Sequence, residues 1–518
     1  MQPASVDQHV DNDAVADVEL FVFLLLAVAV LAGLGIRSGV PYPVALVLGG
    51  LVIGLVPGLP SPELDPDLVF FAFLPPLLYA AAIVISAHEL RANWAPITLL
   101  AVGLVAVTIA AVAAVANAVL GIPWAAAFVL GAVLGPTDPV SAAAVLDRLG
   151  VVGRAKTILE GESLVNDGTA LTAYKLALAA VGGSAGSVLD IGFKFAWVAA
   201  GGIAIGLVVG WAFAHVRRLV TDPSLDVTLS VVTPFAAYVP AEKLGVSGVL
   251  ATVAAGVYMG IVSLDVIEPG TRLRTLAFWD SAAFLLDGLL FLLIGLQVPA
   301  IAGRIETVDP ATLTGYTLLM TAVVMGVRML WMVLPSDATR AERIVIAWSG
   351  MRGGVSLAAA LAIPHAGFPD RDLVIFVAYA VIVLTLVLPG LTLAPLTRRL
   401  GLVESEEDRR AAARARLRIT QAGLDRLERV AGDAPDHVVQ RMRDRYGARV
   451  ERLEARIEGE RDESDLATSG RLLAEMIAAE RDELKALRSE RAAGAEVLRE
   501  IERELDLDES RLRARIRL

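Results

Sequence analysis

Long apolar stretches without charged residues are the feature that most constrains this chain. About thirteen such stretches occur between residues 18 and 397, each roughly twenty residues long, which is the length of an α-helix that crosses a bilayer. A helix also satisfies its own backbone hydrogen bonds, as a chain in lipid must. The sequence therefore predicts an all-α, polytopic membrane protein. The predicted spans are 18–36, 41–56, 67–87, 95–120, 123–147, 156–181, 190–216, 226–243, 246–264, 277–301, 311–334, 341–363 and 372–397.

The composition excludes several other classes of protein. Of the 518 residues, 56% are hydrophobic, and the mean hydropathy is +0.64, whereas soluble domains rarely exceed about half apolar residues. The net charge of −11 comes without a dense basic block, so no nucleic-acid partner is expected. The sequence has no cysteine, which rules out disulfides and thiolate metal sites.

The distribution of basic residues predicts the orientation. Loops after odd-numbered spans carry most of the basic residues, and loops after even-numbered spans carry few, which places the odd loops in the cytoplasm. We therefore expect a multi-pass protein of the inner cell membrane with its N-terminus outside and its C-terminus inside. The predicted parts are an extracytoplasmic tail (1–17), a transmembrane domain (18–400) and a cytoplasmic helical domain (401–518). The basic residues of the odd loops are Arg37, Arg91, Arg148, Arg154, Lys156, Arg217, Arg218, Arg272, Arg274, Arg340, Arg343, Arg398 and Arg399.

The sequence changes character at about Val403, where charged residues begin to alternate with Ala and Leu. This pattern predicts two or three exposed helices, broken near Gly432–Pro435 and near Ser469–Gly470. Two interpretations remain open. The region is either a solvated helical tail or a domain that regulates the protein or supports a dimer.

The sixth predicted span contains an unusual concentration of polar groups. At about 100° per residue, Glu160, Glu162, Ser163, Asn166 and Asp167 fall on one arc of roughly 160°. A polar arc on a membrane-spanning helix must face the protein interior or a water-filled cavity. Ionisable groups at such depth are functional by default, and Asp167 lies close to the middle of the span. The alternative is a buried structural hydrogen-bond network.

The fifth predicted span contains two prolines around a threonine and an aspartate, in the order Gly135, Pro136, Thr137, Asp138, Pro139. Each proline lacks a backbone donor and disfavours helix at the preceding residue. The helix should therefore unwind here, in the middle of the bilayer. Unwound backbone is tolerated at that depth only where it lines a cavity, and its carbonyls are suited to binding ions.

The twelfth predicted span holds a cation among glycines. Gly350, Gly353 and Gly354 bracket Arg352, weaken the helix, and leave a buried guanidinium that needs a carboxylate or carbonyl partners. The fifth and twelfth spans run in opposite directions. Two interrupted helices of opposite direction are typical of inverted-repeat transporters, in which the broken helices cross.

The tenth predicted span adds two further acids, Asp280 and Asp287. They either form a second polar line or pair with Arg328 of the eleventh span.

Five motifs together resemble the sodium/proton antiporter family, in its branch of NhaP proteins and eukaryotic sodium/hydrogen exchangers. The resemblance covers roughly residues 18–400. The motifs are FLPPLLYAA at 73–81, GPTDPV at 135–140, EGESLVNDGTA at 160–170, AEKLGVSGVLA at 241–251 and GMRGGVSLAAALAIP at 350–364.

The resemblance implies roles for several residues. Asp167 becomes the carboxylate that binds either the cation or the proton, and Asn166 marks the electroneutral branch. Thr137 and Asp138 fall on the unwound motif, and Ser163 falls on a ligand position. The sodium, potassium or lithium ion would thus lie at Asp167, Asp138, Ser163 and Thr137, with Asn166 beside it.

The resemblance also implies a structural ion pair between Glu162 and Arg352. One position departs from the pattern of many archaeal relatives, because Ala80 follows Tyr79 where those relatives have an acidic residue. The accessory carboxylate is therefore missing.

The expected function is sodium/proton antiport by alternating access in a homodimer, electroneutral and without a cofactor. The protein would be a secondary active transporter and not an enzyme, with a role in pH homeostasis. A potassium/proton antiporter is the nearest alternative. An intramembrane protease is disfavoured because His88, His215 and His365 lie near span ends, and a primary pump because no GxxxxGK[ST] motif is present. A channel needs no titratable aspartate at mid-depth.

Overall fold

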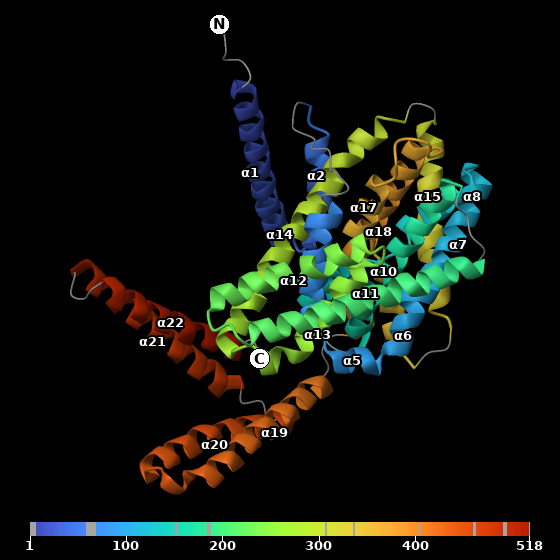
Figure 1. Ribbon diagram of the computed structural model, residues 1–518. Coiled ribbons are helices and arrows are strands. Elements are labelled where there is room, and N and C mark those ends of the chain that lie inside the picture. Colours follow the sequence, from blue (N-terminus) through green and yellow to red (C-terminus); the bar gives the residue numbers. More distant parts are fainter. Residues whose placement is uncertain are drawn as a thin grey trace. The chain divides into compact units, whose positions relative to one another are not determined.

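The computed structural model describes residues 7–57, 69–149, 151, 154–183, 188–305, 308–334, 337–402, 406–458, 463–490 and 495–516. All regular structure within these ranges is helical, as predicted. The chain divides into two compact units, Met1–Val403 and Glu404–Leu518. The helices of the first unit are α1 (Asp7–Ser38), α2 (Tyr42–Gly54), η1 (Val69–Phe73), α4 (Leu74–Val84), α5 (Ala87–Ala92), α6 (Trp94–Thr98), η2 (Leu99–Leu104), α7 (Val105–Val115), η3 (Ala116–Leu120), α8 (Trp124–Val133), α9 (Pro139–Arg148), α10 (Arg154–Val181), α11 (Val188–Arg217), α12 (Pro223–Lys243), α13 (Gly248–Val266), α14 (Pro269–Ala302), α15 (Pro310–Trp331), α16 (Arg340–Trp348), α17 (Gly354–Leu361) and α18 (Arg371–Arg399) (Figure 1).

Each predicted span coincides with one helix or with a run of consecutive helices. Eight helices in the described part of the chain are long and apolar enough to cross a membrane, and α2, the segment Val69–Val84 and α8 are shorter apolar helices. The polytopic helical architecture is therefore confirmed, and the number of thirteen crossings stays a prediction. Helix α1 begins at Asp7, so residues 7–17 of the predicted tail are helical.

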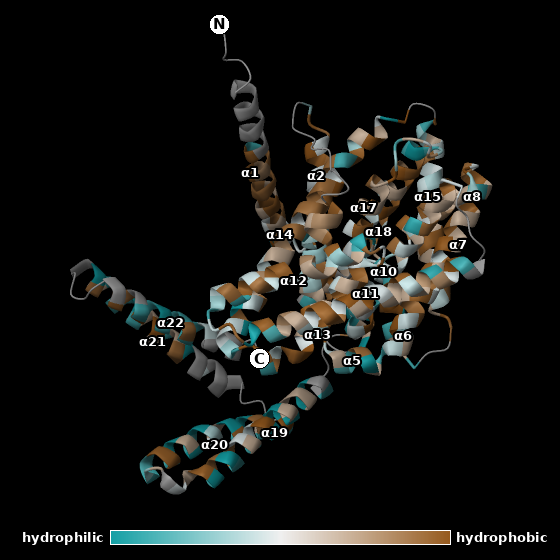
Figure 2. Cartoon of the chain, in the orientation of Figure 1, coloured by the Kyte–Doolittle hydropathy of each residue, from teal (hydrophilic) through white to brown (hydrophobic). Residues whose placement is uncertain are grey.

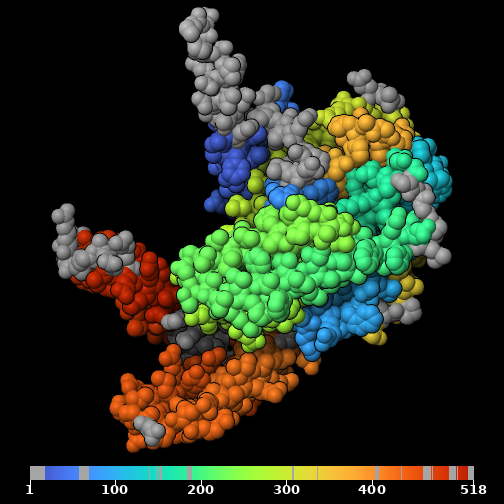
Figure 3. All heavy atoms as spheres, in the orientation of Figure 1, coloured from blue at the N-terminus to red at the C-terminus, as the bar shows by residue number. Residues whose placement is uncertain are grey.

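Hydrophobic residues predominate along many helices of the first unit (Figure 2), and many of their large side chains are exposed. On α11, Phe193 is 73% exposed and Trp197 is 65% exposed. Helices α11, α12 and α13 pack against one another and lie together on the face shown in Figure 3. An exposed apolar surface of this extent is typical of a protein in contact with a membrane or a partner.

Glycines allow α2 and α14 to pack with their backbones in contact. A Cβ added to Gly295 would lie 2.1 Å from the Val47 carbonyl oxygen, and one added to Gly50 would lie 2.3 Å from the Leu292 carbonyl oxygen. In lipid, the hydrophobic effect does not drive helices together. Small residues at the interface let two helices approach closely and gain van der Waals contact instead. The two helices therefore form a closely packed pair.

Helix α10 lies inside the first unit, in contact with α8, α9, α11 and α13. Its middle section is buried both on the polar arc and on the opposite side, where Leu164 is 2% exposed. The polar arc therefore faces protein, as its sequence requires.

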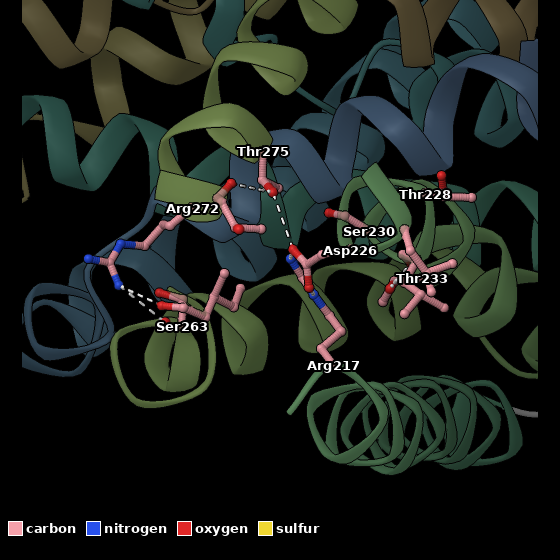
Figure 4. Close-up of polar contacts among 12 residues, drawn as sticks. Arg217, Asp226, Thr228, Ser230, Thr233, Ser263, Arg272 and Thr275 are labelled. Atoms are coloured by element: carbon pink, nitrogen blue, oxygen red, sulfur yellow. Dashed lines mark hydrogen bonds and ion pairs between the residues drawn. The ribbon is translucent and has the colours of Figure 1, made fainter. Parts of the chain in front are cut away.

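A second buried polar network joins the ends of α11, α12 and α14 (Figure 4). Arg217 Nε and Nη2 donate to the two carboxylate oxygens of Asp226 at 2.7 and 2.5 Å, and the Thr275 hydroxyl lies 3.5 Å from the same carboxylate. One turn further along α12, Ser230 accepts a hydrogen bond from Trp279 Nε1 at 2.9 Å. The bidentate geometry fixes how these three helix ends meet.

The second unit consists of α19 (Glu406–Val430), the 3₁₀ turn η4 (Ala431–Asp433), α20 (Asp436–Glu458), α21 (Glu463–Glu490) and α22 (Ala495–Ile516). The break predicted at Gly432–Pro435 is confirmed. The break predicted at Ser469–Gly470 is wrong, because both residues lie inside α21. A glycine costs a helix only about 1 kcal/mol, and α21 packs along α22. The four described helices exceed the two or three predicted.

Each helix pair of the second unit is joined by its own contacts. Arg443 of α20 donates to both carboxylate oxygens of Glu428 of α19 at 2.6 Å, and this hydrogen bonding lowers the pKa of Glu428. Leu484 of α21 packs with Leu498 and Leu505 of α22. Most other side chains are exposed, which agrees with the charged pattern of the sequence.

Candidate ion-binding site

Two helices are interrupted where the sequence predicts it. Helix α8 ends at Val133 and α9 begins at Pro139, and α16 ends at Trp348 and α17 begins at Gly354. The proline pair breaks the first helix because Pro136 and Pro139 cannot donate backbone hydrogen bonds.

The two breaks contact each other. The Asp138 backbone N–H donates to the Met351 carbonyl oxygen at 2.8 Å. A Cβ added to Gly353 would lie 2.6 Å from Asp138 Cβ, so only glycine allows this approach. The broken helices therefore meet at their unwound segments.

Arg352 is bound by backbone carbonyls. Its side chain is 2% exposed, and Nη1 donates to the carbonyl oxygens of Gly135 and Pro136, the latter at 2.5 Å. A buried arginine needs either a carboxylate or carbonyl partners. Arg352 has carbonyl partners, and they belong to the break between α8 and α9. The guanidinium thus satisfies carbonyls that the unwound α8–α9 segment leaves free.

Glu162 pairs with Arg328 of α15, so the predicted pair of Glu162 with Arg352 is wrong. Arg328 Nη1 and Nη2 donate to the two Glu162 oxygens at 2.5 and 2.8 Å, and both side chains are almost fully buried. Arg328 Nε is held by the Ile346 carbonyl oxygen at 3.0 Å. A Cβ added to Gly350 would lie 2.5 Å from Arg328 Cδ, so this glycine leaves space for the arginine stem.

Because Arg328 pairs with Glu162, it is not the partner of Asp280 or Asp287 on α14. Asp280 is exposed and Asp287 is buried, and neither makes an ion pair within the described ranges.

Thr137 joins the first break to α10. Its carbonyl oxygen accepts a hydrogen bond from the Ser163 hydroxyl at 2.9 Å, and its own hydroxyl donates to Glu162 Oε1 at 3.1 Å. Asn166 Nδ2 donates to Thr137 Oγ1 at 2.8 Å. The polar arc of α10 is therefore hydrogen-bonded to the unwound segment.

Asp138 caps the second half-helix. Its carboxylate accepts from the backbone N–H groups of Val140 and Ser141 at 3.2 and 3.1 Å, and from the Ser141 hydroxyl at 2.5 Å. These donors and the positive end of α9 stabilise a negative charge on Asp138. Sequence reasoning did not identify Ser141, although its position three residues after an N-cap aspartate was a signal.

Asp167 stands apart because it has no protein partner. Its side chain is 5% exposed and makes no hydrogen bond or ion pair in the described part of the chain. The adjacent Asn166 Oδ1 is also buried without a partner. The Asp138 charge lies within electrostatic range of Asp167. Unpartnered carboxylate and amide oxygens suit a hard cation, which prefers oxygen ligands.

Glu160 is not part of this cluster. It pairs with Lys156 at 3.6 Å, on the same turn of α10, and Lys156 also pairs with Asp147. The residues brought together at the crossing are therefore Thr137, Asp138, Glu162, Ser163, Asn166, Asp167, Arg328 and Arg352.

The sequence is similar to those of known membrane transporters. The family model described as "Sodium/hydrogen exchanger, transmembrane" matches residues 23–399. An uncharacterized Na(+)/H(+) exchanger of Mycobacterium tuberculosis is 36% identical, over 95% of this chain and 96% of its own. A sodium, potassium, lithium and rubidium/H(+) antiporter of Bacillus pumilus is 35% identical, over 74% of this chain and 62% of its own.

The fold is also similar to a solved structure. The sodium proton antiporter MjNhaP1 of Methanocaldococcus jannaschii, solved at pH 8, superposes with a TM-score of 0.61 at 17% identity, over 75% of this chain and 99% of its own. With a family model that matches residues 23–399 and a relative that is 36% identical over 95% of this chain, this chain is a member of the sodium/hydrogen exchanger family of membrane transporters.

Proposed function

We propose that this protein exchanges a monovalent cation for a proton across the cell membrane by alternating access, with Asp167 as the exchanging carboxylate. The observation that carries the proposal is Asp167 itself, which is buried and makes no hydrogen bond or ion pair with any residue that the structure describes. A buried carboxylate must be neutralised by a proton or by a cation. One group that accepts either species, but not both, couples their fluxes by competition.

The surrounding oxygens complete the proposed cation site. Asp138 contributes a second carboxylate, Asn166 Oδ1 is free to accept, and Ser163 and Thr137 offer hydroxyl oxygens. Glu162 and Arg328 neutralise each other, and backbone carbonyls bind Arg352, so these three residues position the site without binding the ion. No cofactor takes part in this mechanism.

Sodium is the proposed cation and potassium the alternative, which is supported by the broad range of cations in the printed name of the Bacillus pumilus relative. Purified protein in liposomes with a proton gradient tests both. Cation-dependent proton flux should appear on addition of sodium, with lithium and potassium tested separately. Flux with potassium and none with sodium would select the alternative, and flux with no added cation would contradict the proposal.

The basic residues of the odd loops support an N-terminus outside and a C-terminus in the cytoplasm. The exposed apolar face of α11 supports either lipid contact or a homodimer interface. We propose the homodimer, since a fixed scaffold allows the bundle that carries Asp138 and Asp167 to move against it.

We expect exchange to be electroneutral, with one proton for one cation. Asn166 cannot take up a proton, and we expect the donors around Asp138 to keep its carboxylate ionised, so that Asp167 alone carries the exchanged proton. A membrane potential imposed alone should then drive no sodium uptake. If each cycle moved one net charge, a potential of 100 mV would supply about 2.3 kcal/mol and accumulate sodium roughly 50-fold.

The measurement is sodium uptake into liposomes with a thiocyanate gradient as the source of potential, because potassium is itself a candidate substrate. Liposomes with Asp167→Asn protein report the leak. Uptake driven by potential alone would show that Asp138 carries a second proton.

The second unit, Glu404–Leu518, is expected to be dispensable for exchange. It packs as a separate unit, the family model ends at residue 399, and the solved antiporter fold is matched over 99% of its length by 75% of this chain. A chain that ends at Leu402 should therefore keep its maximal exchange rate in liposomes and change at most its regulation. Loss of exchange in a truncated protein that stays folded and inserted would assign the unit a direct role.

A further inference from the structure

Asp287 of α14 is a buried acid that the proposed exchange cycle does not use. Its side chain is 7% exposed and makes no hydrogen bond or ion pair in the described ranges. A carboxylate buried without a partner is costly unless it holds a proton or a cation. An ionisable residue in a membrane-spanning helix is a functional candidate for this reason.

The packing of α14 places Asp287 beside the helix crossing. Leu290 lies one turn after Asp287, on the same face of α14. It packs closely on Gly354, because a Cβ added to Gly354 would lie 2.8 Å from Leu290 Cδ1. The neighbouring Gly353 lies against Asp138 in the same way. The face of α14 that carries Asp287 therefore covers the second break, and the charges of Asp287 and Asp138 act on each other.

Tyr42 lies at the same place from a third element. Its ring is 5.3 Å from the ring of Phe284, which precedes Asp287 by one turn of α14. Its hydroxyl lies within electrostatic range of both Asp287 and Asp138. Tyr42 and Asp287 thus lie on two helices that are in backbone contact at Gly50 and Gly295.

The buried charges at the crossing leave Asp287 unmatched. Arg328 neutralises Glu162, Arg352 is bound by carbonyls, and Asp138 is held by the N-terminus of α9. Two carboxylates, Asp167 and Asp287, then have no protein counterpart among the described residues. Two independent positions are thus available for a positively charged ligand.

We propose that Asp287, with the Tyr42 hydroxyl, forms an approach site that binds the transported cation before it reaches Asp138 and Asp167. The proposal rests on the cation exchange proposed above and adds a residue on a different helix. The approach site raises the local cation concentration and thereby the apparent affinity, while the competition with protons stays at Asp167.

The test compares Asp287→Asn, Asp287→Glu and Asp265→Asn, the last a control that removes an exposed charge at the end of α13. Initial rates of exchange in liposomes are measured against sodium concentration at one pH. Asp287→Asn should raise the half-saturating sodium concentration about tenfold, which corresponds to about 1.4 kcal/mol, at an unchanged maximal rate. Asp287→Glu should restore the wild-type value, and the control should equal wild type.

A second readout is the sodium-induced rise of the thermal unfolding midpoint of the purified protein, which should need about tenfold more sodium in Asp287→Asn. Equal half-saturation in Asp287→Asn and the control would overturn the inference. Complete loss of exchange in a folded Asp287→Asn protein would overturn it as well, because an approach residue is not essential.

If Asp287→Asn does not fold, Tyr42→Phe is the deciding variant. Its half-saturating sodium concentration should be severalfold higher than that of wild type, and an unchanged value would contradict the approach site. Wild-type protein without exchange would refute the proposed function, and the thermal readout would still decide whether Asp287 binds the ion.

Discussion

Replacement of Asp167 by Asn should reduce cation-dependent proton flux to the level of empty liposomes. The substitution removes both the charge that binds the cation and the group that takes up the proton. Since Asp167 pairs with none of the described residues, a neutral amide at this position leaves no opposite charge unpaired among them, and the protein should fold and unfold thermally as wild type does. The measurement is exchange in liposomes together with the unfolding midpoint in detergent.

Glu160→Gln is the matched control for this variant, because Glu160 lies on the same helix but pairs with Lys156 away from the crossing. It should retain the wild-type exchange rate. Residual cation-dependent flux through well-folded Asp167→Asn protein would show that the exchanging carboxylate lies elsewhere.

Breaking the pair of Glu162 and Arg328 should destabilise the protein by about 3–5 kcal/mol, because either single substitution leaves a stranded buried charge. We expect Glu162→Gln and Arg328→Gln to express poorly and to unfold at clearly lower temperature. The double variant should recover part of the loss, since no unpaired charge remains. The thermal unfolding midpoints of the three purified variants measure this coupling.

Lys175→Gln provides the comparison. Lys175 of α10 pairs with Glu242 at 2.6 Å, but its side chain is 57% exposed, so its loss should cost at most about 1 kcal/mol. If Arg328→Gln unfolds at the same temperature as Lys175→Gln, the pair of Glu162 and Arg328 does not stabilise the fold.

The sequence by itself determined the helices of the first unit and the two places where membrane spans are interrupted. Apolar runs of bilayer length predict helices because lipid offers no backbone partner. Pro136 and Pro139 interrupt the fifth span, because each lacks a backbone donor and disfavours helix at the residue before it. The importance of Asp167 also followed locally, because an acid at mid-depth of an apolar helix is costly wherever the helix lies.

The sequence did not determine the partners of the buried charges. Two arginines, Arg328 and Arg352, were available to Glu162, and nothing in the spacing along the chain separates them. The choice depends on how far each side chain reaches after packing. Gly350 opens a path for Arg328 toward Glu162, and the crossing of the two breaks brings the Gly135 and Pro136 carbonyls to Arg352. The resemblance to the family gave the wrong pair, and Arg328, which the sequence offered as a partner of Asp280 and Asp287, binds Glu162.

The placement of Asp280 and Asp287 shows the same limit. Both aspartates lie on α14 with identical chemistry, yet one is exposed and the other is buried beside Asp138. Their difference comes from the neighbours of the helix, since α2 and the α16–α17 break cover only part of its length. Local backbone chemistry is written in the sequence, whereas the pairing of buried charges is decided by the tertiary packing that brings distant helices together.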